Sequence, residues 1–275
     1  MRNIRLQIEY AGTDYAGWQI QNRGSSATIQ ETIEKVLEKI LQEKVKVVGS
    51  GRTDAGVHAL SQAANFKTNS RMFPAKIQQA LNGLLPGDIR IKKANYADND
   101  FHACYSARSK IYRYIILNSK VSSVFLKRFS WHIPYKLDIA LMRKEAKALI
   151  GRHDFSSFCA SGSSAKTRIR TIKRISISVI ARSPAKRDDE AISGKNYLPV
   201  MTAKESFNDS KLIAINIEAN GFLYNMARNI VGTLVEIGRG RLGALSMDKI
   251  LLAKDRKIAG ATAPARGLFL VKVKY

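Results

Sequence analysis

Apolar and polar residues alternate at the start of the chain and then change to a helical spacing. Apolar residues at positions 4, 6 and 8 are separated by polar ones, a period of two that predicts a half-buried strand. After a loop rich in glycine and aromatic residues, apolar residues between Ile29 and Leu41 recur every three or four positions, which predicts an amphipathic helix. Thr28 and Glu31 form a capping box, so we expect this helix to begin at Thr28.

The same two periodicities predict the rest of a first structural unit. A second helix is expected from Pro74 to Leu85, because proline favours the first turn and Pro86-Gly87 stops the pattern. Three further strands are expected over residues 45–48, 62–66 and 89–96. The order strand, helix, strand, strand, helix, strand is that of ferredoxin-like folds, so residues 1–108 are predicted to form one such unit.

Residues 109–275 repeat this order and predict a second unit. Strands are expected over residues 112–117, 171–180, 212–219 and 268–275, with a short extension of the sheet at 131–133. Helices are expected over residues 138–150, 226–237 and 247–254. Residues 181–211 have mixed charges with proline and glycine, which predicts an exposed insertion. The predicted fold class is α+β, with two ferredoxin-like units whose antiparallel sheets lie side by side around a basic cleft.

The charge of the chain indicates that the predicted fold binds nucleic acid. Lys and Arg number 46 against 22 Asp and Glu, for a net charge of +24. The segment 101–137 has seven basic residues and no acid, and the segment 155–187 has eight and no acid. Charge placed only for solubility would be more evenly interspersed, so we expect a polyanionic partner, most often a nucleic acid.

Several classes of protein are disfavoured by what the sequence lacks. Its two cysteines, Cys104 and Cys159, are far apart, which fits a reducing cytoplasm and no disulfide framework. There is no run of eighteen apolar residues, and the N-terminus lacks the apolar core of a signal peptide. No Walker loop, GxGxxG after the first strand, HExxH or paired CxxC is present. We therefore expect no membrane span, and a nucleotide-driven motor, a dinucleotide enzyme and a zinc enzyme are disfavoured.

The segment from Gly49 to Ala59 is the best candidate for a reactive site. It places Asp54 between glycines and beside Arg52. A carboxylate there is either a turn residue bonded to its own backbone or a lone nucleophile, since no second acid lies at a spacing suited to a carboxylate pair. His58 in the same segment is a candidate general base or substrate contact, with a packed structural histidine as the alternative.

Two residues of the second unit are further candidates. Tyr112 lies among basic residues, where an aromatic ring can stack on a base; the alternative is that it packs within the sheet. Arg228 falls in the first turn of a predicted helix, where the helix dipole disfavours a cation. Pairing with a carboxylate would explain this arginine, and a surface contact to phosphate is the alternative.

Eight blocks of sequence, taken together and in order, resemble the TruA family of tRNA pseudouridine synthases. The most specific is GRTDAGVH at residues 51–58. The others are YAGTDYAGWQ at 10–19, LPGDI at 85–89, FHA at 101–103, KIYRY at 110–114, DFSSF at 154–158, MARNIVGT at 226–233 and GLFL at 267–270. The resemblance covers nearly the whole chain.

The resemblance implies a role for each matching residue. Asp54 corresponds to the family's catalytic aspartate, and Arg228 to the arginine that pairs with it. Tyr112 corresponds to the tyrosine that stacks on the target uracil and takes part in proton removal. Leu268 corresponds to the apolar residue beneath the base, and Arg52 to the arginine implicated in displacing the base from the stem.

The resemblance also implies the reaction and its partners. A dimer of two-unit chains, without metal or cofactor, would convert uridine to pseudouridine at positions 38, 39 and 40 of the tRNA anticodon stem-loop. Asp54 would attack C1′ of the ribose or C6 of the base, or would first abstract a ribose proton. No DNA partner is expected. One departure is Cys104, where the family often has arginine after FHA; a basic contact to RNA is either lost or supplied by Arg108 or Lys110.

Two other hypotheses remain open from the residues themselves. A non-catalytic RNA-binding protein of two ferredoxin-like units would explain the charge and the fold. It would not explain Asp54 on a surface that faces phosphate, and the aromatic RNP1 pattern of such modules is missing. A metal-dependent nuclease would need clustered acids, which the motif blocks do not offer.

Overall fold

The computed structural model describes residues 1–21, 26–180, 211–243 and 245–275. The predicted insertion at 181–211 lies outside the described residues, except for Lys211. None of the described helices is long and apolar enough to cross a membrane.

The first half of the chain has the predicted order of elements. They are β1 (Arg2–Tyr10), α1 (Ile29–Leu41), β2 (Val48–Gly49), β3 (His58–Thr68), α2 (Pro74–Leu84) and β4 (Ile89–Ala97). The Thr28 hydroxyl accepts a hydrogen bond from the Glu31 amide at 3.2 Å, so the predicted N-cap of α1 is confirmed. The strand predicted at 45–48 is wrong in its bounds, because only Val48 and Gly49 pair with β3.

The second half contains more elements than the sequence predicted. They are β5 (Ser109–Asn118), β6 (Trp131–Ile133), α3 (Ile139–Ala146), β7 (Gly151–Asp154), β8 (Ile169–Ile180), β9 (Lys211–Ala219), α4 (Met226–Gly238), α5 (Met247–Ala253) and β10 (Leu268–Lys274). Four single 3-10 turns lie between the described elements of this half: Lys147–Leu149, Ser156–Phe158, Arg256–Ile258 and Ala265–Gly267; a fifth, Gly12–Asp14, follows β1 in the first half. The helix predicted at 138–150 ends as one of these turns, and β7 follows it where we expected only a helix stop.

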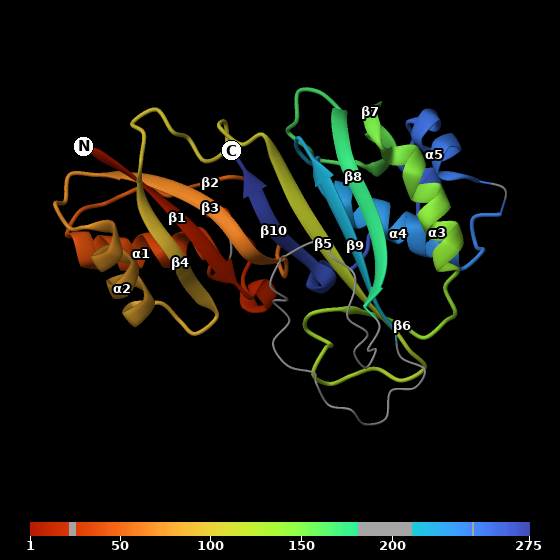
Figure 1. Cartoon of the computed structure of the whole chain (residues 1–275), viewed down its shortest axis with the longest axis horizontal. Helices are drawn as coiled ribbons and strands as arrows, with labels where there is room; N and C mark the ends of the chain where they lie inside the picture. The colour runs from red at the N-terminus through yellow and green to blue at the C-terminus, as the bar shows by residue number, and fades with distance from the viewer. Residues whose placement is uncertain (22–25, 181–210, 244) are drawn as a thin grey trace, which may run out of the picture.

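The described strands join in one mixed sheet instead of two antiparallel sheets. Its order is β4-β1-β3-β10-β5-β9-β8-β7, with β2 added to β3 and β6 to β5. The join is β10, which runs antiparallel to β5 and pairs in parallel with β3 at its start. Figure 1 shows β10 in the middle of the molecule, with α1 and α2 at one end and α3, α4 and α5 at the other.

The alternation predicted for the first strand decides which face of the sheet is covered. Ile4, Leu6 and Ile8 are fully buried in the main apolar core, whereas the polar residues between them lie on the opposite face. The pairing register runs from Tyr10 through Ala59 and Leu270 to Tyr112. These four residues lie side by side on the covered face of the sheet, and they connect the strands of the first half with those of the second.

Two glycines provide a matched test of the packing. Gly232 lies inside α4, where a Cβ would overlap the carbonyl oxygen of Ala261; Gly83 lies in α2 with nothing within 4 Å of such a Cβ. We expect Gly232→Ala to lower the free energy of unfolding by about 3 kcal/mol, because a carbonyl cannot move aside cheaply. Gly83→Ala should raise it by about 0.4–1 kcal/mol through the entropy of the unfolded chain. Urea denaturation of both variants measures the two free energies of unfolding. Equal changes in the two variants would contradict the close contact between Gly232 and Ala261.

Candidate active site

The loop that carries Asp54 is held by the N-terminal segment of the chain. The backbone amide of Trp18 donates to the carbonyl of Thr53 at 3.0 Å, and the hydroxyls of Thr53 and Tyr10 are 2.8 Å apart. Gly17, at a φ of +96°, lies so close that a Cβ would come within 2.6 Å of the same carbonyl. The loop backbone is therefore held at Thr53, directly before Asp54, by the chain's own contacts.

Asp54 meets Arg228 although 174 residues separate them. Nη1 of Arg228 lies 3.2 Å from Oδ2 of Asp54, and the two side chains are 18% and 29% exposed respectively. Arg228 also donates from Nε to the carbonyl of Ala263 at 2.7 Å and from Nη1 to Oδ1 of Asn225 at 2.8 Å. The guanidinium is thus oriented by three groups, and one side of the pair stays open to a ligand.

Tyr112 comes from β5 and lies within electrostatic reach of the carboxylate. Burial, reinforced by the charges of Tyr10 and Asp54, raises the pKa of Tyr112 well above its usual range. The edge of its ring meets the ring of Phe222 at a centroid distance of 4.8 Å. At neutral pH the hydroxyl is protonated, so it can donate a proton or relay one but is not an ionised base before substrate binds.

Comparison with known proteins assigns this arrangement to a family. A family model described as "tRNA pseudouridine synthase" matches residues 7–106 and 146–275. This chain belongs to the tRNA pseudouridine synthase family. It is an isomerase of the TruA type, which confirms the predicted enzyme class and tRNA modification as its activity. The hypotheses of a non-catalytic RNA-binding protein and of a nuclease are therefore set aside.

Relatives match this synthase from end to end. The tRNA pseudouridine synthases A of Acetivibrio thermocellus and of Thermoanaerobacter sp. (strain X514) are each 44% identical over 275 residues, covering all of both chains. That of Ruminiclostridium cellulolyticum is 41% identical over the same length. A chain of a solved Cbf5-Nop10-Gar1 complex matches at 12% identity with a TM-score of 0.31, covering 98% of this chain and 58% of that one, a likeness too weak to carry an argument.

Two more of the predicted residues lie near Tyr112 and Asp54, in different surroundings. Leu268 is 6% exposed at the start of β10 and pairs with Tyr114, next to the pair of Leu270 and Tyr112. Arg52 is exposed beside Asp54 and makes no hydrogen bond or ion pair with any other described residue. Leu268 is therefore a buried apolar neighbour of the residues around Tyr112, and the side chain of Arg52 is open to solvent.

His58 is placed as a structural residue of the synthase. It is 1% exposed, and its Nδ1 accepts a hydrogen bond from the amide of Gly12 at 3.1 Å. Its Nε2 lies 3.1 Å and 3.2 Å from the carbonyls of Arg128 and Arg266, and its ring stacks on Phe269. Burial lowers the pKa of His58. Both ring nitrogens are used by the protein backbone, so the geometry does not favour the predicted substrate contact.

Sequence reasoning missed the residue that orients Arg228. Asn225 precedes α4 in a left-handed conformation, with a φ of 57°, and turns its side chain to Arg228 instead of capping the helix. Asparagine tolerates this conformation better than most residues, so its place before a predicted helix was the available signal. Among the described residues, no group of three or more His, Cys, Asp or Glu side chains is arranged to hold a metal ion.

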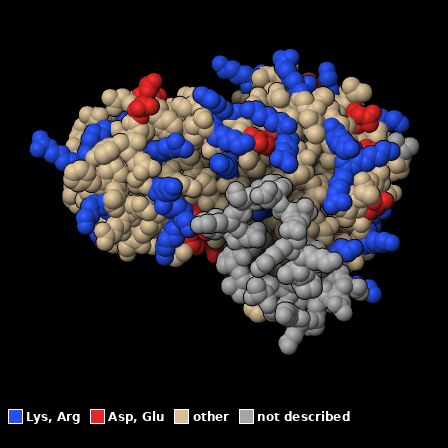
Figure 2. All heavy atoms as spheres, in the orientation of Figure 1, with Lys and Arg blue, Asp and Glu red and all other residues tan. Residues whose placement is uncertain are grey.

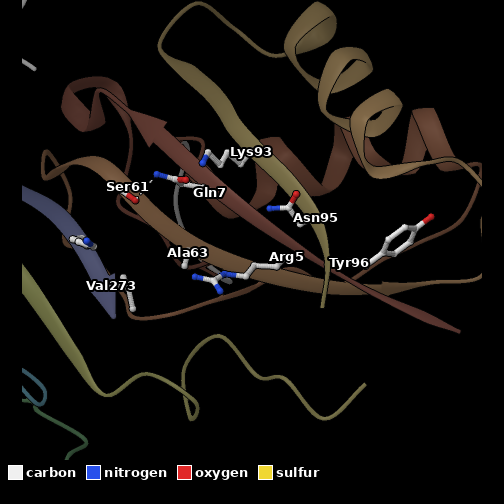
Figure 3. A pocket seen from close by; sticks show the side chains of 9 residues that line it. Arg5, Gln7, Ser61, Ala63, Lys93, Asn95, Tyr96 and Val273 are labelled. Atoms are coloured by element: carbon white, nitrogen blue, oxygen red, sulfur yellow. Dashed lines mark hydrogen bonds between the residues drawn. The ribbon is translucent and has the colours of Figure 1, made fainter. Parts of the chain in front are cut away.

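The basic charge extends well beyond the synthase site. Figure 2 shows Lys and Arg side chains over both halves of the face turned to the viewer and gathered between them, with few acids. A hollow of about 380 Å³ on the open face of the sheet includes Arg5, Lys93 and Lys272 (Figure 3). Arg5 alternates with the core residues of β1, so this hollow lies on the opposite face from Tyr112.

Proposed function

We propose that this synthase isomerises uridine to pseudouridine at positions 38, 39 and 40 of the tRNA anticodon stem-loop, with Asp54 as the nucleophile and the target base flipped out of the stem. The observation that carries the proposal is the carboxylate of Asp54, paired with Arg228 and open on one side, beside the ring of Tyr112. The tRNA positions rest on the family resemblance.

The reaction needs little beyond a nucleophile and a closed pocket. The bond between C1′ and N1 breaks, the uracil turns, and a bond forms between C1′ and C5, while the proton on C5 is lost and N1 gains one. Asp54 attacks C1′ or C6, or first abstracts a ribose proton, and each route uses the same carboxylate. Arg228 holds this carboxylate in place, since its other contacts to Ala263 and Asn225 fix the guanidinium.

Opening the stem is the costly step before chemistry. Extrusion of a paired base costs a few kcal/mol, which phosphate contacts from the basic surface offset with a steep dependence on salt. Arg52 is exposed next to Asp54 and fills the space that the base leaves in the stem. Leu268 and Tyr112 then enclose the extruded uracil from the apolar side.

Tyr112 is proposed to stack on the uracil and to assist transfer of the C5 proton. Tyr112→Phe keeps the ring and loses the hydroxyl, so we expect RNA affinity within a few-fold of wild type and a rate of pseudouridine formation lowered about 10²-fold. Tyr112→Ala should lower affinity as well, because the stacking surface is lost. Single-turnover kinetics with separate binding measurements check this. A Tyr112→Phe enzyme with an unchanged rate would leave the hydroxyl without a chemical role.

The same proposal includes the organisation of the protein. Residues 1–108 and 109–275 are proposed as two ferredoxin-like units. The strand orders β4-β1-β3-β2 and β10-β5-β9-β8 both place the strands of a unit in the spatial order fourth, first, third, second. We further propose a cytoplasmic homodimer that binds tRNA and not DNA. Sedimentation equilibrium measures the oligomeric state, and competition between tRNA and duplex DNA measures the preference for RNA.

The direct test is a map of modified positions. Unmodified tRNA transcripts with uridine at 38, 39 or 40 are incubated with the enzyme, and pseudouridine is located by carbodiimide treatment and primer extension. We expect stops at these positions alone, and none in transcripts that carry cytidine there. Pseudouridine elsewhere in the tRNA, with none in the anticodon stem-loop, would overturn the proposed substrate site while leaving the family assignment intact.

A further inference from the structure

Lys110 is a charged residue of the site region that the sequence offers only as one of two substitutes for a basic contact to RNA, with no defined ligand, and the proposed mechanism does not use it. It lies on β5 two positions before Tyr112, so both side chains are on the same face of the sheet. The residue is only partly exposed, and burial lowers the pKa of its ammonium. The charge of a Cys104 thiolate would act in the opposite direction. Lys110 therefore holds a cation in surroundings that disfavour it.

The ammonium rests on the loop that carries Asp54. A Cβ added at Gly51 would lie 2.7 Å from Nζ of Lys110 and 3.5 Å from its Cε. Gly51 is next to Arg52 and three residues before Asp54, and its own carbonyl is bonded by the side chain of Gln62 at 2.9 Å. The missing side chain of Gly51 is what lets the ammonium approach the loop so closely.

No described residue neutralises this ammonium through a hydrogen bond or an ion pair. The carboxylate of Asp54 is paired with Arg228. Glu218, which lies opposite Ile111 on β9, is bonded by Ser109 at 2.8 Å and by Lys274 at 2.7 Å. A partly buried cation without an anion is costly, so these surroundings favour an anionic ligand supplied from outside the described chain.

We propose that Lys110 binds a phosphodiester of the RNA backbone that flanks the target uridine. The inference rests on the proposed function. If the target base reaches Asp54, the RNA backbone on either side of that base must pass close to the loop that carries Asp54. Gly51 provides room for the ammonium, and the exposed guanidinium of Arg52 lies on the same stretch of loop. Lys110 acts as a positioning residue: it holds the nucleotide while Asp54 performs the chemistry.

The first experiment replaces the charge and measures binding. Lys110→Met should weaken binding of a synthetic anticodon stem-loop RNA about tenfold, as expected for loss of a charged hydrogen bond. The slope of log Kd against log salt should fall by about 0.7–0.9, the effect of one phosphate contact. The single-turnover rate at saturating RNA should change less than threefold. Cys104→Ser and Lys93→Met serve as controls: the first removes the thiol near Lys110, and the second removes a cation on the opposite face.

A second variant tests the same contact without touching the charge. Gly51 does not have a positive φ, so alanine fits the backbone there, but its Cβ would displace the ammonium. Gly51→Ala should therefore reproduce the loss of affinity caused by Lys110→Met, and the double variant should be no weaker than either single one. This design keeps the proposal testable if one of the single variants folds poorly.

The decisive experiment pairs the variant with an altered RNA. Neutral methylphosphonate linkages are placed in turn on the 5′ and 3′ sides of the target uridine. We expect one of them to weaken binding by the wild type about tenfold and to have no further effect on Lys110→Met. Additive losses at both linkages would overturn the phosphate contact, as would a lowered saturating rate with unchanged affinity, which would place Lys110 in the chemistry. Absence of pseudouridine with the unaltered RNA and wild-type enzyme would instead refute the proposed function.

Discussion

Replacement of Asp54 by asparagine should remove pseudouridine formation almost completely and leave RNA binding nearly intact. Asparagine has the shape of aspartate, so the loop held by Trp18 and Tyr10 stays in place. An amide oxygen is a poor nucleophile and carries no charge for Arg228 to orient. We expect a rate at least about 10⁴-fold lower, the scale seen when an enzyme loses its nucleophile. Release of tritium from C5-labelled uridine in tRNA measures the rate, and filter binding measures the affinity.

A second acid of the N-terminal segment supplies the control for this prediction. Asp14 lies 3.4 Å from Arg128 in an exposed ion pair, with both side chains more than half exposed. Asp14→Asn removes the same charge at a surface site and should leave turnover within about twofold, since such pairs contribute little. Turnover by Asp54→Asn above one hundredth of the wild-type rate would remove Asp54 from the role of nucleophile.

Replacement of Arg228 should slow the reaction more than it weakens binding. Its guanidinium contacts Asp54, Ala263 and Asn225 at once, and the single nitrogen of lysine cannot reproduce this geometry. We expect Arg228→Gln to lower the rate about 10²–10³-fold, the usual effect of removing one preorganised group. Arg228→Lys should recover only a small part of this loss. The affinity for tRNA should change less than about fivefold, because the pair faces the base and not the backbone.

The end of the same helix offers a matched control. Arg239 follows the last residue of α4 and pairs with Glu236 at 3.1 Å. Arg239→Gln removes a partly buried arginine of similar exposure far from Asp54, so its rate should stay near that of the wild type. An Arg228→Gln enzyme with normal saturating rate and weakened binding would show that Arg228 contacts phosphate, which is the alternative that its sequence position leaves open.

The sequence predicted the elements better than their association. Thr28 and the alternation in β1 are local signals, and both are confirmed. Pairing of β10 with β3 depends on residues more than 200 positions apart, and no local pattern encodes it. The short β2 and the missed β7 have the same cause, since whether a segment of four residues becomes a strand is decided by a partner strand and not by propensity.

The residues of the candidate site also differ in whether a local sequence signal predicts them. An arginine in the first turn of α4 is locally unfavourable, and this conflict predicts an anionic partner, either a carboxylate or a phosphate. Asn225 and Lys110 gave no comparable signal. Asn225 matters because it orients Arg228, three residues later, toward the distant Asp54. Lys110 matters because the distant Gly51 comes to lie against it. His58 is the opposite case. It belongs to a motif that suggests chemistry, but both of its ring nitrogens are hydrogen-bonded to the backbone of three separate segments.

The central place of β10 has a consequence for biosynthesis. Every other described strand leaves the ribosome before β10 does, yet β3 and β5 complete their pairing only through it. Until then both strands present open edges, which are prone to pair with other chains. The carbonyl of Ala263 that orients Arg228 also arrives late. A nascent chain can therefore fold its first unit early and still remain catalytically silent until translation has passed the last strand.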